Sequence, residues 1–375
     1  MFQISNRVAQ IPEALSIYIN QIVYSLKRHG HDPIVLSLGE AFFDIPLYDF
    51  SKLDVQKSYH YSESQGLPEL RRKISDYYRK YYRAIVDPDT EILITAGSKP
   101  AIFMAMQVVL NPADEILIHE PAWLSYREQA RLLDAVPKFI PYDTKAQKFS
   151  EYFTPRTRIV VINNPNNPAG VIYSQQDLES IYAQCAPQGI YVMVDEAYSD
   201  FVIDGTFTSM ATVVPKKQGI IVVNSLSKNM GMSGWRIGYV VADKRFIREL
   251  LKVNQHLITC APTILLHYMA RYFDDVLSVT LPQVQEVVLK RARVAGMLDE
   301  LGLQRLGGAS TFYFFVSIGN FPGTSHDFAM HLLLERGIAV VPGSAYGEST
   351  DRFIRVAIGS ESEDRIWQAL NVIAM

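Results

Sequence analysis

The chain carries an amine, a carboxylate and a guanidinium at positions where single side chains can do chemistry. Lys228 ends the string Ser-Leu-Ser-Lys, shortly after an apolar run that finishes at Val223. Asp195 ends another apolar run, and Arg236 stands in a Gly-Trp-Arg-Ile-Gly string eight residues after Lys228. An amine, an acid and an anion-binding group together suit a cofactor with an aldehyde, a ring nitrogen and a phosphate. Pyridoxal phosphate is such a cofactor, and a lysine Schiff base is its usual attachment.

Each of these residues also has an ordinary structural interpretation. A loop lysine is most often a solvated surface charge, whereas burial beside cations such as Arg236 would lower the pKa of Lys228. Asp195 would hold a ring nitrogen protonated, or it would cap a helix that follows the strand. Tyr198, three residues later, would hydrogen-bond a phenolic oxygen of the ring or simply pack in the core.

Two loop segments add candidate binding groups. Residues 163–170 contain four asparagines and two prolines, which favour a tight turn that aims the Asn167 amide at a ligand or serves only as a turn. Gly97-Ser98-Lys99 precedes an expected helix, whose first N–H groups attract phosphate, although a plain helix start explains the string equally well. Ser225 and Arg236 would complete such an anion pocket.

Two further side chains are candidates with weaker signals. Trp123 follows an expected strand, where its indole would stack on a cofactor ring or lie in the core. Arg355 alternates with apolar residues late in the chain. It would bind a substrate carboxylate, or form an ion pair on the surface of a small domain. His29 with His31, and His119 with Glu120, show no metal-binding pattern, so no metal is expected.

Alternating apolar runs and helical patterns predict an α/β fold with a mostly parallel central sheet flanked by helices. Strands are expected at 91–95, 115–118, 158–162, 190–194, 220–223 and 235–241, the last as a candidate edge strand. Because such sheets bind ligands at the carboxyl ends of their strands, the candidate groups should gather there. We expect a large domain at 47–285 and a smaller α+β domain from both chain ends, 1–46 and 286–375. A long, interrupted helical pattern follows Pro262 and runs towards Leu301.

Composition narrows the possible environments and partners. The 375 residues are 48% hydrophobic and 20% charged, with a net charge of −3, which gives no reason to expect nucleic acid or an anionic membrane. The basic segment 71–83 carries apolar residues at helical spacing, so its basic face is expected to be solvated. Two cysteines without a partner motif fit a reduced, cytoplasmic setting, and no apolar stretch approaches the length of a membrane helix.

Four strings together resemble the class I/II aminotransferases, the fold-type-I pyridoxal-phosphate enzymes of the aspartate aminotransferase superfamily. Residues 164–170 resemble the family string N-P-x-N-P-T-G, with Ala169 in place of threonine. Residues 225–238 resemble S-x-S-K…G-x-R-x-G, and residues 61–71 resemble Y-x-x-x-x-G-x-x-x-L-R. Residues 39–43 resemble G-E-P-D-F, but Ala41 and Phe42 replace the proline and the aspartate.

The resemblance implies roles for individual residues. Lys228 would hold the cofactor and carry the proton, Asp195 would pair with the ring nitrogen, and Asn167 and Tyr198 would contact the ring oxygen. Ser98, Lys99, Ser225 and Arg236 would line the phosphate site. Tyr61 would reach the phosphate of a neighbouring subunit, which implies a homodimer. The substrate carboxylate would meet Gly39, Asn167 and Arg355.

The sequence therefore predicts an aminotransferase that moves an amino group from an L-amino acid to a 2-oxo acid by a ping-pong mechanism. One alternative keeps the cofactor and changes the chemistry, as in a fold-type-I carbon–sulfur β-lyase. Another is a pyridoxal-phosphate-binding sensor domain without catalysis. The donor and the acceptor depend on pocket shape, and the sequence does not identify them.

Overall fold

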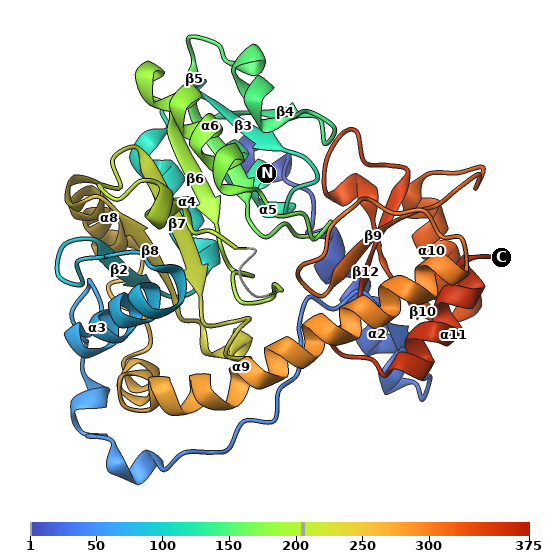
Figure 1. Ribbon diagram of the computed structural model, residues 1–375, viewed down its shortest axis with the longest axis horizontal. Helices are drawn as coiled ribbons and strands as arrows, with labels where there is room; N and C mark the ends of the chain where they lie inside the picture. Colours follow the sequence, from blue (N-terminus) through green and yellow to red (C-terminus); the bar gives the residue numbers. More distant parts are fainter. Residues whose placement is uncertain (1, 204–206) are drawn as a thin grey trace.

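The structure is a computed structural model that describes residues 2–203 and 207–375. Its central sheet has the strand order β2-β8-β7-β6-β5-β3-β4 (Figure 1). The strands are β2 (Ile92–Thr95), β3 (Glu115–His119), β4 (Val136–Ile140), β5 (Thr157–Asn163), β6 (Tyr191–Asp195), β7 (Ile220–Ser225) and β8 (Gly238–Ala242). Strands β4, β3, β5, β6 and β7 run parallel, and only β8 runs against its neighbours. The prediction of a mostly parallel central sheet is confirmed.

Strand β8 corrects one prediction and explains one feature of the site. It pairs with β2 on one side and β7 on the other, so the expectation of an edge strand is wrong. The true strand also starts later than expected, because residues Ser233–Trp235 form a short 3-10 helix. Since β8 is antiparallel to both neighbours, its beginning lies at the sheet edge where the other strands end. Arg236, two residues before β8, is therefore brought to that edge.

Helices cover both faces of the central sheet. One face packs against α4 (Ser98–Val109), α5 (Ser125–Leu132) and α8 (Lys244–Leu257). The other packs against α3 (Pro68–Tyr77), α6 (Gln175–Cys185), the one-turn helix α7 (Met210–Val213) and the first half of α9 (Thr263–Glu300). Along β7, successive side chains enter the two cores alternately, as strand geometry requires. Burial on both sides explains why these strands read as continuous apolar runs.

Helix α9 joins two hydrophobic cores. It runs for 38 residues with Pro282 inside it, so the expectation of an interrupted pattern is wrong. Its buried residues up to Leu277 pack in the core of the central sheet, whereas Val284 and later ones pack in a second core. Figure 1 shows this helix, in orange, passing from the large sheet to the smaller part of the molecule.

The smaller part contains two small sheets. One is antiparallel, with β11 (Val341–Pro342), β12 (Phe353–Ala357) and β9 (Tyr313–Ser317) in that order. The other pairs β1 (Ile34–Val35) with β10 (Ile338–Ala339). Helices α2 (Leu15–Arg28), α10 (Ser325–Arg336) and α11 (Glu363–Ile373) pack against these strands. The short helix α1 (Asn6–Ala9) instead reaches the large part, where Arg7 donates to the Leu132 carbonyl at 3.1 Å.

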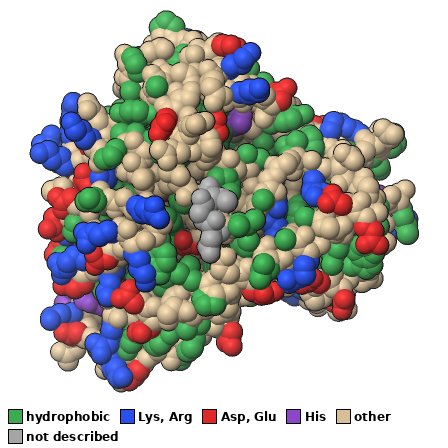
Figure 2. Space-filling model, viewed as in Figure 1, with side chains coloured by type: hydrophobic (Ala, Val, Ile, Leu, Met, Phe, Trp, Pro, Cys, Tyr) green, Lys and Arg blue, Asp and Glu red, His purple; other side chains and the backbone are tan. Residues whose placement is uncertain are grey.

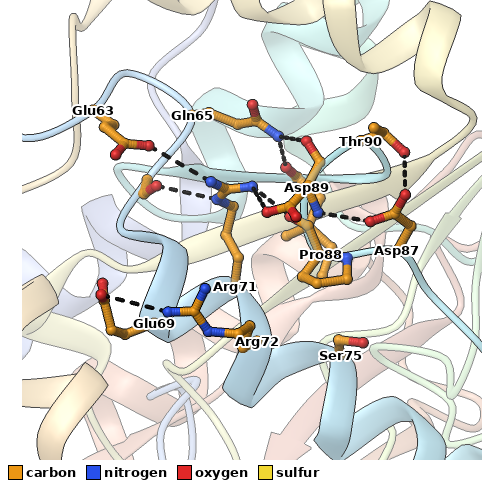
Figure 3. A network of polar contacts seen from close by, with 12 residues as sticks. Glu63, Gln65, Glu69, Arg71, Arg72, Ser75, Asp87, Pro88, Asp89 and Thr90 are labelled. Atoms are coloured by element: carbon orange, nitrogen blue, oxygen red, sulfur yellow. Dashed lines mark hydrogen bonds and ion pairs between the residues drawn. The ribbon is translucent and has the colours of Figure 1, made fainter.

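The basic segment after Gly66 differs from the prediction at one residue. Arg71 is only 5% exposed, although its neighbour Arg72 lies on the surface as expected. The Arg71 guanidinium donates to the carbonyls of Gly66 and Pro88 and forms an ion pair with Asp89 (Figure 3). It therefore fastens the segment at 61–66 to the loop that leads into β2.

The surface carries charges of both signs. On the face shown in Figure 2, Lys and Arg side chains lie among Asp and Glu side chains, mainly over the large part. In residues 2–203 and 207–375, no helix combines the length and the apolar character needed to cross a membrane.

Candidate active site

A cavity of about 430 Å³ opens at the carboxyl edge of the central sheet. Nine of the predicted site residues line it, and they come from the loops after β2, β3, β5, β6 and β7 and from the turn before β8. These residues are Ser98, Lys99, Trp123, Asn167, Asp195, Tyr198, Ser225, Lys228 and Arg236. The remaining lining residues are Glu40, Asn163, Ala197, Ser227, Ser233 and Gly234. The predicted gathering of groups at the strand ends is thus what the fold produces.

Lys228 points into the cavity rather than into solvent. Its Nζ donates to the Gly39 carbonyl at 2.6 Å and lies 5.7 Å from the centre of the Tyr198 ring. Burial, with smaller contributions from the Arg355 and Arg236 cations, lowers the pKa of Lys228 to about 8 against the opposing effects of Glu40 and Asp195. The interpretation as a solvated surface lysine is wrong. A buried amine with this pKa is partly neutral near pH 7, as a nucleophile must be.

Asp195 is a buried carboxylate at the end of β6. It is 7% exposed, and its oxygens accept hydrogen bonds from the Tyr126 hydroxyl at 2.7 Å and the Ala197 amide at 3.1 Å. Burial raises the pKa of Asp195 above its ordinary value. Residues 197–202 form turns, so Asp195 does not cap a helix. A buried carboxylate of this kind would gain from a cationic partner such as a protonated ring nitrogen.

The asparagine-rich turn after β5 is held by its own side chains. Asn163 Oδ1 accepts from the Asn167 amide at 2.6 Å, and Asn166 Oδ1 accepts from the Ala169 amide at 2.9 Å. With the backbone thus fixed, the Asn167 side chain lies at the cavity and donates to the Tyr198 hydroxyl at 3.4 Å. Tyr198 itself is buried and shares a 2.8 Å hydrogen bond with the hydroxyl of Tyr313.

Two backbone segments approach each other closely at one side of the cavity. Gly97 has a φ of +96°, and a Cβ there would lie 2.5 Å from Arg236 Nη2. A Cβ at Gly238 would lie 2.4 Å from the Ser98 amide nitrogen. Two glycines therefore let the start of α4 and the Arg236 guanidinium come together. Amides at a helix start beside a guanidinium are well suited to a phosphate.

Arg355 is a buried guanidinium on β12, in the smaller part. It is 4% exposed, and it donates to the Ser37 carbonyl at 2.7 Å and to Asn167 Oδ1 at 3.4 Å. In the part of the chain that the structure describes, Arg355 has no carboxylate partner and its Nε has no hydrogen-bond partner. The interpretation as a surface ion pair is wrong. A buried guanidinium without an anion is poised to receive one.

Of the predicted site residues, Gly39, Tyr61 and Arg355 do not line the cavity, whereas Trp123 does. Gly39 stands behind Lys228, and a Cβ there would lie 3.1 Å from the Tyr313 hydroxyl. Trp123 is half-buried at the cavity, with Lys99 Nζ 5.1 Å from its ring centre. Tyr61 is 85% exposed and does not line the cavity of its own chain.

The sequence reading missed several groups that shape the site. Glu40 lines the cavity and accepts from Ser233, although it stands in the 39–43 string, and Tyr126 donates a hydrogen bond to Asp195. Behind the cavity, buried Asp200 accepts a 2.7 Å hydrogen bond from Asn229, the neighbour of Lys228. No sequence pattern marks Asp200, because its partners Tyr77 and Tyr82 come from α3 and the π-helical turn after it.

The donor set fits pyridoxal phosphate. The Lys228 amine faces the cavity after β7, the Asp195 carboxylate lies at the end of β6, and the Arg236 guanidinium lies beside the start of α4. The Tyr198 hydroxyl and the Asn167 amide also line the cavity. These are the groups that an aldehyde, a ring nitrogen, a phosphate and a ring oxygen require.

Comparison with known proteins agrees with this chemistry. Residues 37–373 match the family model described as aminotransferase class I and II. The chain belongs to the class I/II aminotransferases. A probable N-acetyl-LL-diaminopimelate aminotransferase of Bacillus subtilis is 32% identical to it, over 92% of this chain and 90% of the relative. An aspartate aminotransferase of Pyrococcus abyssi is 31% identical over 88% of each chain.

Solved structures confirm the fold of this aminotransferase. The aspartate aminotransferase from Thermus thermophilus with maleate superposes with a TM-score of 0.92, at 27% identity, covering 100% of this chain and 99% of that one. The predictions of family, fold class, transamination and pyridoxal phosphate as cofactor are thereby confirmed. The enzyme is a transferase of amino groups between amino acids and 2-oxo acids.

Proposed function

We propose that this aminotransferase works by two half-reactions in which Lys228 is the base and Arg355 holds the substrate carboxylate. The observation that carries the proposal is that the cavity into which Lys228 points has a guanidinium at each of two ends: Arg236 lines it, and buried Arg355 donates to Asn167 in its wall. One end, around Arg236, suits a phosphate. The other, at Arg355, suits the carboxylate that every amino acid and 2-oxo acid carries.

The residues that would hold the cofactor follow from the contacts described above. Ser98, Lys99, Ser225 and Arg236 would hold the phosphate, and Asp195 would pair with the ring nitrogen. Asn167 and Tyr198 would contact the ring oxygen, and Trp123 would stack on the ring. When bound, pyridoxal phosphate supplies an aldehyde that takes up the amino group and a ring that accepts electrons from the substrate α-carbon.

The role of Lys228 follows from its position and its pKa. Once the amino donor has displaced it, Lys228 Nζ is free to take the proton from the donor's α-carbon. A pKa of about 8, caused mainly by burial, leaves part of the amine unprotonated near neutral pH. Arg355 and Asn167, with Gly39 at the margin, would fix the substrate carboxylate and so aim the Cα–H bond at Nζ.

Oligomeric state, domain boundaries and location belong to the proposal as well. A homodimer would allow exposed Tyr61 to reach a phosphate in the neighbouring subunit. We place the large domain at 47–285 and the small one at 1–46 and 286–375, supported by the pairing of β1 with β10 and by the change of core along α9. A cytoplasmic location is supported by two free cysteines.

The test is to replace Lys228 and follow the covalent link. Lys228→Ala should lose the borohydride-reducible attachment of pyridoxal phosphate and nearly all turnover of an amino acid with a 2-oxo acid. Lys252→Ala, at an exposed lysine on α8, serves as the matched control and should keep both. A Lys228→Ala enzyme that still forms the reducible link would refute the assignment.

A second measurement separates phosphate binding from ring chemistry. Arg236→Ala should release pyridoxal phosphate faster while leaving the spectrum of the bound fraction nearly unchanged, because the guanidinium lies at the phosphate end. Normal retention would remove Arg236 from the phosphate site. Release of pyruvate and ammonia from a cysteine-type substrate without any 2-oxo acid would instead favour lyase chemistry.

A further inference from the structure

Tyr313 is buried beside Tyr198, and the resemblance to known enzymes gave it no role. It lies on β9, and its hydroxyl is 2.8 Å from that of Tyr198. Its ring packs against the Arg355 guanidinium, whose Cζ is 4.6 Å from the ring centre. In the antiparallel pairing of β12 with β9, Arg355 stands opposite Phe315, so Tyr313, two residues away, is on the same face.

The hydrogen bonds around Tyr198 limit where its proton can point. A tyrosine hydroxyl has one donor and two acceptor positions. Asn167 Nδ2 donates to the Tyr198 oxygen and occupies one acceptor position. If Tyr313 also donates, both acceptor positions are filled and the Tyr198 O–H must point elsewhere. The remaining direction is toward the cavity, which Tyr198 lines.

The surroundings favour Tyr313 as the donor of this pair. Burial raises the pKa of both phenols, that of Tyr198 well above its ordinary value, and the Arg355 cation opposes the rise at both. At Tyr313 this cation is the largest influence after burial, whereas at Tyr198 other groups outweigh it. The more acidic phenol is the better donor. The Arg355 guanidinium packs against the Tyr313 ring, so the group proposed to bind the substrate carboxylate also makes the Tyr313 hydroxyl a better hydrogen-bond donor to Tyr198.

Gly39 makes room for this arrangement. A Cβ at Gly39 would lie 3.1 Å from the Tyr313 hydroxyl, which is tighter than ordinary van der Waals contact. The carbonyl of the same glycine accepts from Lys228. One residue without a side chain therefore lets Tyr313 and Lys228 approach the same point from two sides.

We propose that Tyr313 is a positioning residue that donates its hydrogen bond to Tyr198 and so makes Tyr198 a committed donor toward the cofactor's ring oxygen. The inference rests on the proposed contact between Tyr198 and that oxygen. A donor at the ring oxygen stabilises the form of the bound chromophore that has lost its proton. Tyr313 therefore holds the chromophore's pKa down without touching the cofactor.

The experiment is a spectroscopic pH titration of the holoenzyme, which reads the chromophore and not the activity. Tyr313→Phe keeps the ring against Arg355 and removes only the hydroxyl. The chromophore pKa should rise by roughly half a unit to one unit, the size of one neutral hydrogen bond. The matched control is Tyr346→Phe, since the Tyr346 ring lies 5.5 Å from the Arg355 Cζ. Its buried hydroxyl has no hydrogen-bond partner among the described residues, so this variant should titrate like the wild type.

A double-variant cycle identifies the route. Tyr198→Phe should raise the chromophore pKa, and adding Tyr313→Phe to it should cause no further rise, because the effect passes through Tyr198. An unchanged pKa in Tyr313→Phe, or an equal rise in the Tyr198→Phe background, would overturn the inference and leave the proposed function standing. No rise in Tyr198→Phe itself would remove Tyr198 from the ring oxygen and sink the inference with it.

Discussion

Arg355→Met tests whether the buried guanidinium serves the substrate or the fold. Arg355 is 4% exposed and forms no ion pair within residues 2–203 and 207–375. Methionine is of similar length and carries no charge. We therefore expect the change to affect substrates that have a carboxylate and to leave the folded protein largely unaffected.

The size of the effect follows from leaving a substrate carboxylate buried without its partner. Breaking such a pair costs about 3 to 5 kcal/mol, which corresponds to a loss of about 150- to 4,000-fold in kcat/KM. Arg355→Lys should recover only part of this loss, because an ammonium keeps the charge but lacks the planar fork that meets both carboxylate oxygens.

The assay compares an L-amino acid with the amine formed by its decarboxylation, each in a single half-reaction followed by the absorbance of the bound cofactor. The wild type should strongly prefer the acid, and Arg355→Met should lose most of that preference by slowing only the acid. Arg352→Met is the control, since Arg352 is an exposed neighbour that binds the carbonyls of Gly319 and Gly323. An equal slowing of acid and amine in Arg355→Met would refute the reasoning.

Stability gives an independent check on the same variant. Arg355→Met leaves the Ser37 carbonyl without its donor, at a cost of about 1 to 3 kcal/mol. It also removes a buried charge that lacks a counter-ion, and this gain in stability offsets the cost of the unpaired Ser37 carbonyl. Urea unfolding of the cofactor-free variant should therefore show a free energy of unfolding within about 1 kcal/mol of the wild type. A loss of 4 kcal/mol or more would mark Arg355 as structural.

Three further predictions concern other parts of the molecule. At pH 7, the free energy of unfolding of cofactor-free Lys228→Met, measured in urea, should exceed that of the wild type by up to ~3 kcal/mol. The pKa of Lys228 is about 8 in the folded protein and 10.5 for an ordinary lysine, so the stability of the wild type rises with pH between these values. The stability advantage of Lys228→Met should therefore vanish near pH 11. An advantage that stays constant with pH would contradict this prediction. Gly97→Ala should speed pyridoxal phosphate release at least tenfold, because its Cβ would lie 2.5 Å from Arg236 Nη2. Unchanged release would mean that the turn adapts. Arg71→Ala should cost about 3 kcal/mol in urea unfolding, whereas exposed Arg72→Ala should cost under about 0.5 kcal/mol; equal costs would refute the structural role of Arg71.

Residues that belong to a continuous local signal were predictable from the sequence. The parallel strands are buried on both faces, and their apolar runs placed β3, β5, β6 and β7 to within a few residues. Groups that directly follow these strands, such as Asp195 and Lys228, were then placed by topology alone. Strand β4 was missed because it lies at the edge of the sheet and is only partly buried, so its sequence lacks such a run.

Features that depend on tertiary pairing were not predictable. Residues 338–341 form one apolar run in the sequence, Ile-Ala-Val-Val, but its two ends join different sheets, β10 with β1 and β11 with β12. The burial of Arg71 depends on carbonyls that lie beyond its own helix, at Gly66 and Pro88. In the same way, Tyr313 meets Tyr198 only because the two parts of the molecule pack together at the cavity.

The direction of β8 decides where Arg236 lies relative to the cavity and to Arg355. Had this strand been parallel to its neighbours, its beginning would lie at the opposite edge of the sheet, and Arg236 would be far from the cavity. Because β8 is antiparallel to β7, it begins at the edge where β7 ends, and the loop 226–237, which carries Lys228 and Arg236, stays at that edge. Arg236 is thus fixed by the large sheet, whereas Arg355 is fixed by β12 of the smaller part. Because the two guanidiniums stand on separate sheets, a movement between the parts would change the distance between them and would also move Arg355 relative to Asn167, which belongs to the large part.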